Sequence, residues 1–449
     1  MSGKTTKKRL AAASLSAFLL TGALIPAGAF AAAQEGSQPA ISAESAEVNK
    51  TAAAAAHNAA NPFRIVAIGD SITVGYELGM NEKTVPYGYA DRLYEQALYY
   101  SAAEIQNFGI LGLKSSGLQN WLAAAENNQS ITPDEVQQGI TKYPNAAETI
   151  GKTQGLHKAI QEADLIAMTI GGNDFLSLFD EMGERTFSSE ELTSVLTERL
   201  EGYISSLHEA LLSIAAINPN AGIVLTDQYL PIPKPSALIK VFSDEQYAVL
   251  KAGVTQLSDK VTELVDSLAK EGLDVRVANI SNSFAGNELL YTSIMKKDSH
   301  PSQAGYEAIG EAFAAAIWGS SRKPAALAAD VPLRVVVNGK DVNGTNKPIV
   351  KNGTTFLPMR DIAGVLGANL KWDNKSQTAT IIAGDKTVAF TIGAKTMKVN
   401  GQSVPLETPA YLEKTGKNAA TYLPLAALSR GLDYQVIYRS SIKTAFINS

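Results

Sequence analysis

The stretch Phe63-Arg64-Ile65-Val66-Ala67-Ile68-Gly69-Asp70-Ser71 gives the first strong structural signal of this chain. Its apolar run is bounded by Pro62 and Gly69, which is typical of a short strand buried on both faces. The run ends in a turn that leaves a serine hydroxyl directly after the strand. A Gly-Asp-Ser after a strand can be an ordinary turn, so its meaning depends on the motifs further along the chain.

Further apolar runs occur downstream, each preceded by a helical pattern. We expect strands at Glu104–Phe108, Leu165–Ile170, Gly222–Thr226 and Val275–Ile280, and helices at Tyr87–Tyr99, Leu156–Glu162, Glu190–Ala216, Asp244–Ala269 and Pro301–Trp318. Apolar strands that alternate with helices predict a parallel five-stranded sheet covered on both faces, a three-layer α/β/α sandwich. The site of such a sheet lies at the carboxyl ends of its strands.

Polar and glycine-rich motifs stand at those strand ends. Ser71 follows the first strand, Gly112 the second and Asn173 the third, whereas His300 lies between the last strand and the last helix. A serine hydroxyl needs a base to take its proton, and the oxyanion then formed needs hydrogen-bond donors. We therefore assign Ser71 as nucleophile and His300 as base, with the N–H groups of Ser71 and Gly112 and the Asn173 amide as the oxyanion hole.

The choice of base follows by elimination among four histidines. His57 lies in a low-complexity stretch, and His157 and His208 lie in helical patterns. Only His300 stands in a loop that leads into a helix, as expected of a base presented to a substrate. Two carboxylates near the motifs, Asp70 and Asp174, are interpreted as hydrogen-bonding groups of their loops rather than proton carriers.

The motifs Gly69-Asp70-Ser71, Asn107 to Gly112, Gly172-Asn173-Asp174 and His300-Pro301-Ser302 resemble, in this order, the blocks of the SGNH/GDSL hydrolases. The resemblance covers roughly residues 62–320. It implies a serine hydrolase that acts on esters, in which Ser71, Gly112, Asn173 and His300 correspond to the four residues that name the family.

One position departs from the family pattern. The family usually has an aspartate three residues before the histidine, and this chain has Lys297 there, with Asp298 two residues before His300. Either a shifted loop lets Asp298 hold the imidazole, or a backbone carbonyl or another aspartate does so. We name Asp298 as the third catalytic residue, and the alternatives stay open at this point.

The C-terminal part of the chain has a different sequence pattern from the α/β part. Residues 320–331 are predicted to be a linker, and residues 332–449 contain short β-type runs separated by Asn-Gly turns. Val337-Asn338-Gly339 recurs as Val399-Asn400-Gly401, and Phe356-Leu357-Pro358 recurs as Tyr422-Leu423-Pro424. This predicts two copies of one β-rich unit with short helices.

The tail resembles the stalk-type repeat at the start of some copper amine oxidases and on many exported proteins. The second copy is degraded, with Ala426 where the first has Arg360. The resemblance implies a spacer or wall-associated module that contacts a cell wall or polysaccharide. It does not imply copper, because the tail contains no histidine or cysteine.

Composition excludes several classes of function. The chain has 449 residues, a net charge of −5 and no cysteine. Nucleic acid is not expected as a partner, because phosphate binding needs clustered lysine and arginine. Disulfides and thiolate metal sites are excluded, no His-Glu-x-x-His pair occurs, and no cofactor or metal is implied.

The N-terminus predicts export. Positive residues precede an apolar stretch, Ala11 to Ala23, and small residues follow in Ala29-Phe30-Ala31-Ala32-Ala33. This is the layout of a cleavable signal over residues 1–33, and residues 34–61 form a low-complexity leader before a hydrolase domain at 62–319. We expect a secreted protein, with wall association through the tail as a further option, and no membrane span in the mature chain.

Together these features predict a secreted serine hydrolase that cleaves small-molecule or lipid carboxylic esters through an acyl-enzyme on Ser71. Two alternatives are a carbohydrate esterase that removes O-acetyl groups from polysaccharide, and a wall-binding protein with a relic hydrolase domain. The inserts 113–155 and 176–200 and the loop Pro231 to Pro235 are expected to shape the acyl pocket.

Overall fold

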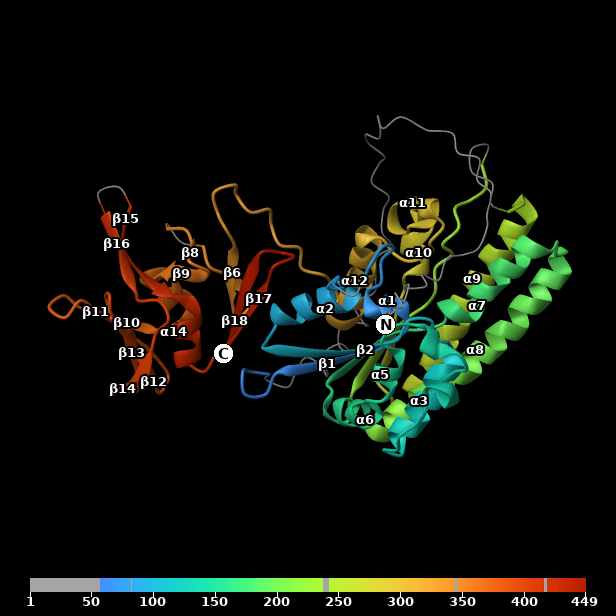
Figure 1. Cartoon of the computed structure of the whole chain (residues 1–449), viewed down its shortest axis with the longest axis horizontal. Coiled ribbons are helices and arrows are strands. Elements are labelled where there is room, and N and C mark those ends of the chain that lie inside the picture. The colour runs from blue at the N-terminus through green and yellow to red at the C-terminus, as the bar shows by residue number, and fades with distance from the viewer. Residues whose placement is uncertain (1–56, 82, 237–241, 344–345, 416–417) are drawn as a thin grey trace, which may run out of the picture. The chain divides into compact units, whose positions relative to one another are not determined.

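The computed structural model describes residues 57–81, 83–236, 242–343, 346–415 and 418–449 (Figure 1). The predicted signal segment and most of the predicted leader lie outside these residues. The chain divides into two compact units, and the boundary along the sequence falls between Ser321 and Arg322. Residues 57–64 and Tyr94–Glu104 are grouped with the second unit.

The expected five-stranded parallel sheet is present, with the strand order β2-β1-β3-β4-β5. Its strands are β1 (Phe63–Gly69), β2 (Ala103–Gly109), β3 (Leu165–Thr169), β4 (Gly222–Thr226) and β5 (Val275–Ala278). Ile65 pairs with Leu165, and Leu165 pairs in turn with Gly222. All residues of β3 and β4 are buried, which explains why these strands are apolar without alternation.

Helices connect the strands and cover both faces of the sheet (Figure 1). In the α/β part they are α1 (Ser71–Val74), α2 (Tyr89–Leu98), α3 (Ser115–Glu126), α4 (Pro133–Val136), α5 (Ala146–Ile150), α6 (Thr153–Glu162), α7 (Gly172–Glu184), α8 (Ser189–Ile217), α9 (Asp244–Lys270), α10 (Ser281–Phe284), α11 (Glu288–Tyr291) and α12 (Gln303–Trp318). Short 3₁₀ turns lie at η3 (Ile140–Lys142) and η4 (Ile294–Lys296).

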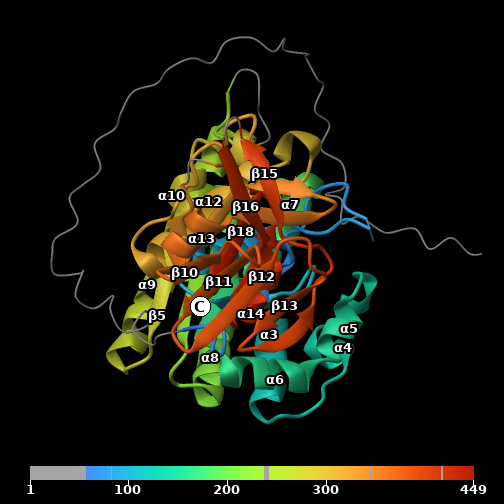
Figure 2. The ribbon, with the colours of Figure 1, turned by 90° about the vertical axis from the view of Figure 1, so that its left-hand side faces the viewer.

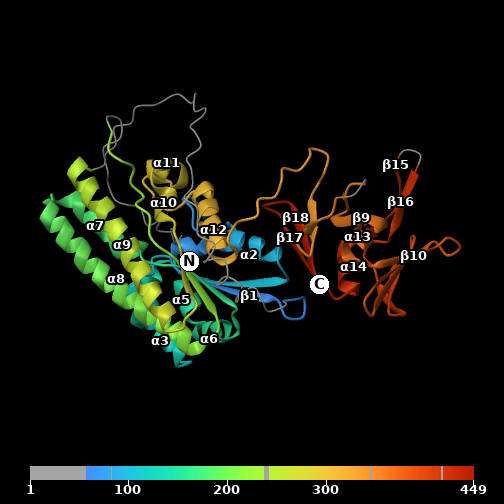
Figure 3. The ribbon, with the colours of Figure 1, turned by 180° about the vertical axis from the view of Figure 1, so that it is seen from behind.

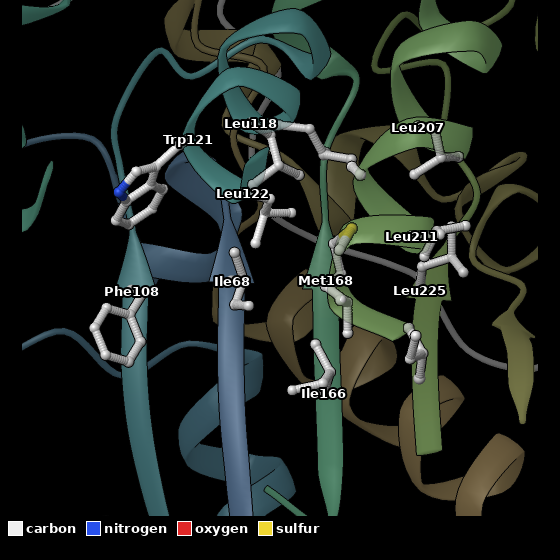
Figure 4. Packing of buried hydrophobic residues seen from close by; sticks show 14 of the residues in the cluster. Ile68, Phe108, Leu118, Trp121, Leu122, Ile166, Met168, Leu207, Leu211 and Leu225 are labelled. Atoms are coloured by element: carbon white, nitrogen blue, oxygen red, sulfur yellow. The ribbon is translucent and has the colours of Figure 1, made fainter. Parts of the chain in front are cut away.

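One face of the sheet packs against α3, α6 and α8. Figure 4 shows three such contacts, with Trp121 of α3 near Phe108 of β2, Leu122 of α3 near Ile68 of β1, and Leu211 of α8 near Leu225 of β4. The Trp121 indole N–H donates to the Thr153 hydroxyl at 2.9 Å, so its one polar group is satisfied inside the core. This core fixes the strands whose carboxyl ends carry the motif residues.

The opposite face packs against α2 and α12. The rings of Tyr89 in α2 and Phe313 in α12 stack with centroids 4.6 Å apart. The predicted helix from Pro301 begins two residues later, because the Ser302 hydroxyl accepts the Gly305 N–H at 3.2 Å and caps α12.

Strand ends differ from the predicted bounds for a similar local reason. The predicted strand Val275–Ile280 ends at Ala278, because the Ile280 N–H donates to the buried carboxylate of Asp227 at 2.7 Å instead of to a strand.

Helix α3 and most of helix α7 lie in segments that were predicted to be inserts. Neither helix was predicted. Gly117 and the pair Gly171-Gly172 disfavour a helix locally, but burial of the apolar faces of the two helices outweighs this cost.

Helices α7, α8 and α9 lie next to one another in both Figure 1 and Figure 3. Both long helices start at complete capping boxes, formed by Ser188 with Glu191 in α8 and by Ser243 with Gln246 in α9. No helix among the described residues is long and apolar enough to cross a membrane.

The second unit contains the expected β-rich domain with short helices. Its strands are β6 (Arg334–Val337), β7 (Lys340–Asp341), β8 (Ile349–Lys351), β9 (Thr354–Pro358), β10 (Asn369–Asp373), β11 (Thr378–Ala383), β12 (Lys386–Thr391), β13 (Thr396–Val399), β14 (Gln402–Pro405), β15 (Tyr411–Thr415), β16 (Asn418–Pro424), β17 (Gln435–Arg439) and β18 (Thr444–Asn448), and its helices are α13 (Met359–Leu366) and α14 (Leu425–Gly431). Strands β10, β11, β12 and β13 are neighbours in one antiparallel sheet (Figure 2).

The repeated Leu-Pro motifs of this unit pair with each other. Strands β9 and β16 are antiparallel, with Leu357 opposite Leu423, Pro358 opposite Tyr422 and Phe356 opposite Pro424. Each strand leads directly into a short helix, α13 or α14. Leu357 and Leu423 are both buried in the core of the unit.

Candidate active site

Ser71 lies where β1 turns sharply into α1. Gly69 has φ +143°, and a Cβ there would lie 1.9 Å from the carbonyl oxygen of Thr169, so this turn beside β3 requires glycine. Asp70 caps α1 by accepting the Ile72 N–H at 3.0 Å. Ser71 is therefore the first residue of α1, at the carboxyl end of β1, and it is buried with 6% exposed.

His300 lies in the loop between η4 and α12, and this loop is held by contacts on several sides. The Ser293 N–H donates to the His300 carbonyl at 3.0 Å, and the Tyr229 hydroxyl donates to the Ser299 carbonyl at 2.9 Å. The Tyr76 ring meets the imidazole edge-on, with centroids 4.6 Å apart. The imidazole is thus placed by its own backbone and by a neighbouring ring.

The structure joins Ser71, His300 and Asp298 in one hydrogen-bonded chain. His300 Nε2 lies 2.8 Å from Ser71 Oγ, and His300 Nδ1 lies 2.7 Å from Asp298 Oδ1. The side chains of His300 and Asp298 are 16% and 6% exposed. A hydroxyl, an imidazole and a carboxylate in this order are the groups that nucleophilic catalysis by serine needs.

The loop geometry explains how Asp298 reaches the imidazole from only two residues away. Asp298 Oδ1 also accepts the His300 backbone N–H at 2.8 Å, which closes a turn between an aspartate side chain and the residue two positions on. Lys297, at the position where the family pattern has aspartate, is exposed and adopts a left-handed conformation with φ +62°. Of the alternatives left open by the sequence, the structure places the Asp298 carboxylate against the imidazole.

Asp298 is held in its charged form. Burial acts to raise the pKa of this carboxyl, but the side-chain hydrogen bond and the charge of His300, with the His300 N–H, lower it below its usual value overall. A carboxylate that stays ionised can stabilise an imidazolium on His300.

A second carboxyl, Asp70, lies fully buried beside Ser71. Burial raises the pKa of Asp70 to about 6, although its hydrogen bonds from Ile72 N–H and Thr169 Oγ1 and a positive charge on His300 lower it, and nearby Asp174 raises it. Asp70 therefore changes charge near neutral pH. Its ionised form attracts a positive charge on His300.

The remaining motif residues are linked through the start of α3. Asn173, in the first turn of α7, donates from Nδ2 to the Leu113 carbonyl at 2.9 Å. A carboxamide nitrogen has two protons, so Asn173 can donate a second hydrogen bond. Asp174 accepts the Ser115 hydroxyl at 2.6 Å; burial raises its pKa, and the Ser115 hydrogen bonds oppose the shift.

Gly112 lies next to Leu113 in a left-handed conformation with φ +73°. Its carbonyl accepts the Gln137 amide at 2.9 Å, and a Cβ on Gly112 would fall 2.0 Å from the Tyr143 ring. Ser71, Asn173 and His300 line one pocket, and Gly112 is not among its lining residues. Gly112 is thus connected to the pocket through Leu113 and Asn173.

The pocket next to Ser71 and His300 is mainly apolar. Its walls come from α7, α8 and α9, and they include Phe175, Phe179, Leu196, Leu200, Leu250 and Leu257. The insert 176–200 contributes to these walls, and so does Pro231 of the predicted loop.

None of the residues of the insert 113–155, all of which are described, lines this pocket. Its helix α3 instead packs into the main core of the sheet. Tyr76 and Tyr229, which place the His300 loop, were not predicted, because no sequence pattern marks them. A useful signal was the run Phe175 to Phe179 directly after the Gly-Gly-Asn-Asp motif, since an apolar helix there borders a site at the strand ends.

The described residues contain no group of three or more histidine, aspartate or glutamate side chains that could hold a metal ion. The polar groups at this site are those of the hydrogen-bonded chain and the loops around it.

The α/β part matches a known family. The model of the GDSL-like lipase/acylhydrolase family matches residues 65–313, which is more than half of the chain. The chain belongs to this family. Residues 336–447 of the same chain match the copper amine oxidase N-terminal domain.

Several solved structures are similar to this GDSL hydrolase. A lipase from a goat rumen metagenome is 22% identical with a TM-score of 0.39, and the match covers 58% of this chain and 99% of that one. An extracellular lipase from Streptomyces rimosus is 15% identical with a TM-score of 0.36, covering 56% and 99%. A Clostridium thermocellum family 3 carbohydrate esterase is 16% identical with a TM-score of 0.31, covering 57% and 94%. A comparison with curated proteins returns no match.

The buried Asp70 carboxyl predicts an unusual dependence of stability on pH. Its pKa of about 6 exceeds the ordinary value of 3.8, so the folded state holds a proton that the unfolded state has lost between these values. The free energy of unfolding should therefore fall by about 3 kcal/mol as the pH rises through this range. Asp70→Asn removes this loss of stability. The melting temperature of Asp70→Asn minus that of wild type should therefore be higher at pH ~7.5 than at pH ~4.

Differential scanning calorimetry of both proteins at the two pH values measures this difference. Asp259→Asn, at an exposed position in α9, is the matched control and should show no such pH dependence. If the melting-temperature difference from wild type changed equally with pH for Asp70→Asn and Asp259→Asn, this result would contradict the assignment of a proton to Asp70.

Proposed function

We propose that this protein is a serine carboxylic-ester hydrolase that works through an acyl-enzyme on Ser71. The observation that carries the proposal is the hydrogen-bonded chain from Ser71 Oγ through His300 to the charged Asp298. Membership of the GDSL-like lipase/acylhydrolase family supports the ester as the bond that is cleaved.

The reaction proceeds in two halves. His300 Nε2 takes the Ser71 proton while Oγ attacks the ester carbonyl, and the imidazolium then returns the proton to the departing alcohol as the bond to it breaks. Water next gives a proton to His300 and attacks the acyl carbon. As the bond from the acyl carbon to Ser71 Oγ breaks, His300 passes this proton to Oγ, which releases the acid and restores Ser71. Asp298 remains ionised throughout and stabilises the imidazolium.

The negative charge on the carbonyl oxygen is stabilised by donors from three segments. The Ser71 N–H belongs to the first turn of α1, where N–H groups have no partner within the helix. The second Nδ2 proton of Asn173 and the N–H of Gly112 complete the proposed oxyanion hole. The Leu113 carbonyl fixes the Asn173 amide, so this donor is preorganised before substrate binds.

The two competing proposals differ in what they require of this site. A relic hydrolase domain would not need to keep the buried Ser71–His300–Asp298 chain, whose hydrogen bonds are all between 2.7 and 2.8 Å long. A carbohydrate O-acetyl esterase needs room for a sugar but little room for an acyl chain. The apolar pocket next to Ser71 favours a longer acyl group.

The first test of the proposed function is Ser71→Ala. Without the hydroxyl no acyl-enzyme can form, so kcat for a p-nitrophenyl ester should fall by about 10⁶, as for removal of a catalytic serine elsewhere. A fluorophosphonate should label the wild type at Ser71 and leave Ser71→Ala unlabelled, as read by peptide mass spectrometry. Undiminished turnover in folded Ser71→Ala would disprove the assignment.

The second test separates the two functions of Asp298. Because one oxygen accepts both the His300 N–H and Nδ1–H, the amide oxygen of Asp298→Asn can keep the imidazole in place while the charge is lost. Asp298→Ala loses both functions, so its kcat should fall by about 10⁴, and Asp298→Asn should lie between it and wild type.

Steady-state kinetics at saturating substrate measure both Asp298 variants, with folding checked by circular dichroism. Lys297→Asn is the control, because asparagine tolerates the left-handed conformation of this exposed residue and activity should stay within about twofold. A loss below about tenfold in Asp298→Ala would remove Asp298 from the site.

The proposal includes export of the protein by a cleaved signal. Its support is the sequence itself, in which Lys4, Lys7 and Lys8 precede the apolar stretch and small residues at Ala31 to Ala33 come after it. The mature chain should begin between Ala32 and Gln34, as determined by N-terminal sequencing of protein from culture medium. Recovery of only the uncleaved chain from the cells would contradict export.

A further inference from the structure

We propose that the pocket between α7, α8 and α9 binds the acyl chain of a medium-chain ester, of about eight carbons, as the preferred substrate. This inference rests on the proposed serine ester hydrolysis and adds the class of acyl group. It is carried by the position, lining and length of the pocket.

The pocket starts at the proposed reaction centre. Ser71 and His300 line it together with Asn173, so a carbonyl carbon at Ser71 lies at its entrance. Most of the other lining residues are apolar, including Ile72, Phe175 and Leu200. An acyl group attached to Ser71 would therefore pass directly from polar donors into an apolar channel.

The apolar walls belong to two separate hydrophobic clusters. Leu200 and Leu257 are part of the main core. Phe179 and Leu250 belong to a second cluster, to which the C-terminal half of α7 and the N-terminal halves of α8 and α9 contribute. The pocket occupies the junction between these clusters. An apolar cavity that is left empty destabilises a protein in proportion to its volume, and such cavities bind apolar ligands.

A glycine in the middle of α9 helps keep this space open. Glycine within a helix costs roughly 1 kcal/mol relative to alanine. Gly253 nevertheless lines the pocket in this 27-residue helix, and a Cβ there would lie 3.2 Å from Leu196 Cδ1. Any larger side chain at this position would extend into the space between α8 and α9.

The length of the pocket sets the length of the acyl chain. Its lining on α9 extends from Leu250 to Leu257, which corresponds to about 10 Å at 1.5 Å per residue. An extended chain of about eight carbons spans this distance, given carbon–carbon bonds of roughly 1.5 Å. Each buried methylene strengthens binding about fourfold, so the preference for longer acyl chains should be large.

The experiment compares p-nitrophenyl acetate, octanoate and an acetylated xylo-oligosaccharide with the full-length chain, below the micelle concentration of the octanoate. Wild type should show kcat/KM for octanoate at least about tenfold above that for acetate. Gly253→Leu should lower the octanoate value at least about tenfold relative to the acetate value, because the added side chain fills the space beside Leu196.

The matched control is Gly202→Leu. Gly202 lies in the middle of the adjacent helix α8 at an exposed position where a Cβ would have no atom within 4 Å, and it does not line the pocket. The control makes the same chemical change in a helix of similar length, and both activities should stay within about twofold of wild type. It thereby separates pocket filling from a general effect of added surface leucine.

A second variant keeps the test decisive if Gly253→Leu does not fold. Leu196→Ala enlarges the pocket at the wall opposite Gly253, so it should raise the ratio of kcat/KM for dodecanoate to that for octanoate. Circular dichroism and fluorophosphonate labelling of Ser71 confirm a folded, competent site in each variant.

The outcomes distinguish this inference from the proposed function. Acetate turnover and Ser71 labelling without a preference for octanoate, or equal losses on both esters in Gly253→Leu, would overturn the acyl pocket alone. Preference for the acetylated oligosaccharide would also overturn it and support the O-acetyl esterase. Absence of turnover and labelling in the wild type would overturn both proposals.

Discussion

The site depends on one shared oxygen atom. Asp298 Oδ1 accepts both the backbone N–H and the Nδ1–H of His300, so the same interaction folds the loop and orients the ring. A carboxylate three residues earlier would need a longer turn to reach the imidazole. In this chain the left-handed Lys297 and the side-chain turn after it shorten the path. The identity of the third residue is therefore set by backbone geometry as much as by chemistry.

The sheet brings together groups that are far apart in the sequence. Parallel strands place Ser71 at the end of β1 and Asn173 just beyond β3, and β1 and β3 pair directly. Gly69 lets the turn after β1 pass close to the Thr169 carbonyl, and the buried Asp70 then starts α1 by capping it. The same arrangement places an ionisable group with a pKa of about 6 beside Ser71, so fold stability and the electrostatics of the site are coupled there.

Much of the α/β architecture could be predicted from sequence, because strands that are buried on both faces are continuous apolar runs. The apolar run ending at Gly69 and the run beginning at Leu165 needed no tertiary information to be identified. Other features depend on contacts that sequence spacing does not report. Helix α7 begins within a pair of glycines, the loop of His300 relies on the Tyr229 hydroxyl, and the pocket joins helices from distant segments. The insert 113–155 shows the same limit, since an apolar insert can fill a core as readily as it can line a site.

The pairing of β9 with β16 has a consequence for how this tail can evolve. Leu357 of the first repeat lies opposite Leu423 of the second, so each copy covers a strand edge of the other. Of this four-stranded sheet, the first copy alone would retain only the hairpin of β8 and β9, and the edge of β9 would be open to pairing with other chains. Deletion of one copy would therefore expose a strand edge, a feature that promotes aggregation. The two repeats therefore form one structural unit, and evolution must keep them together.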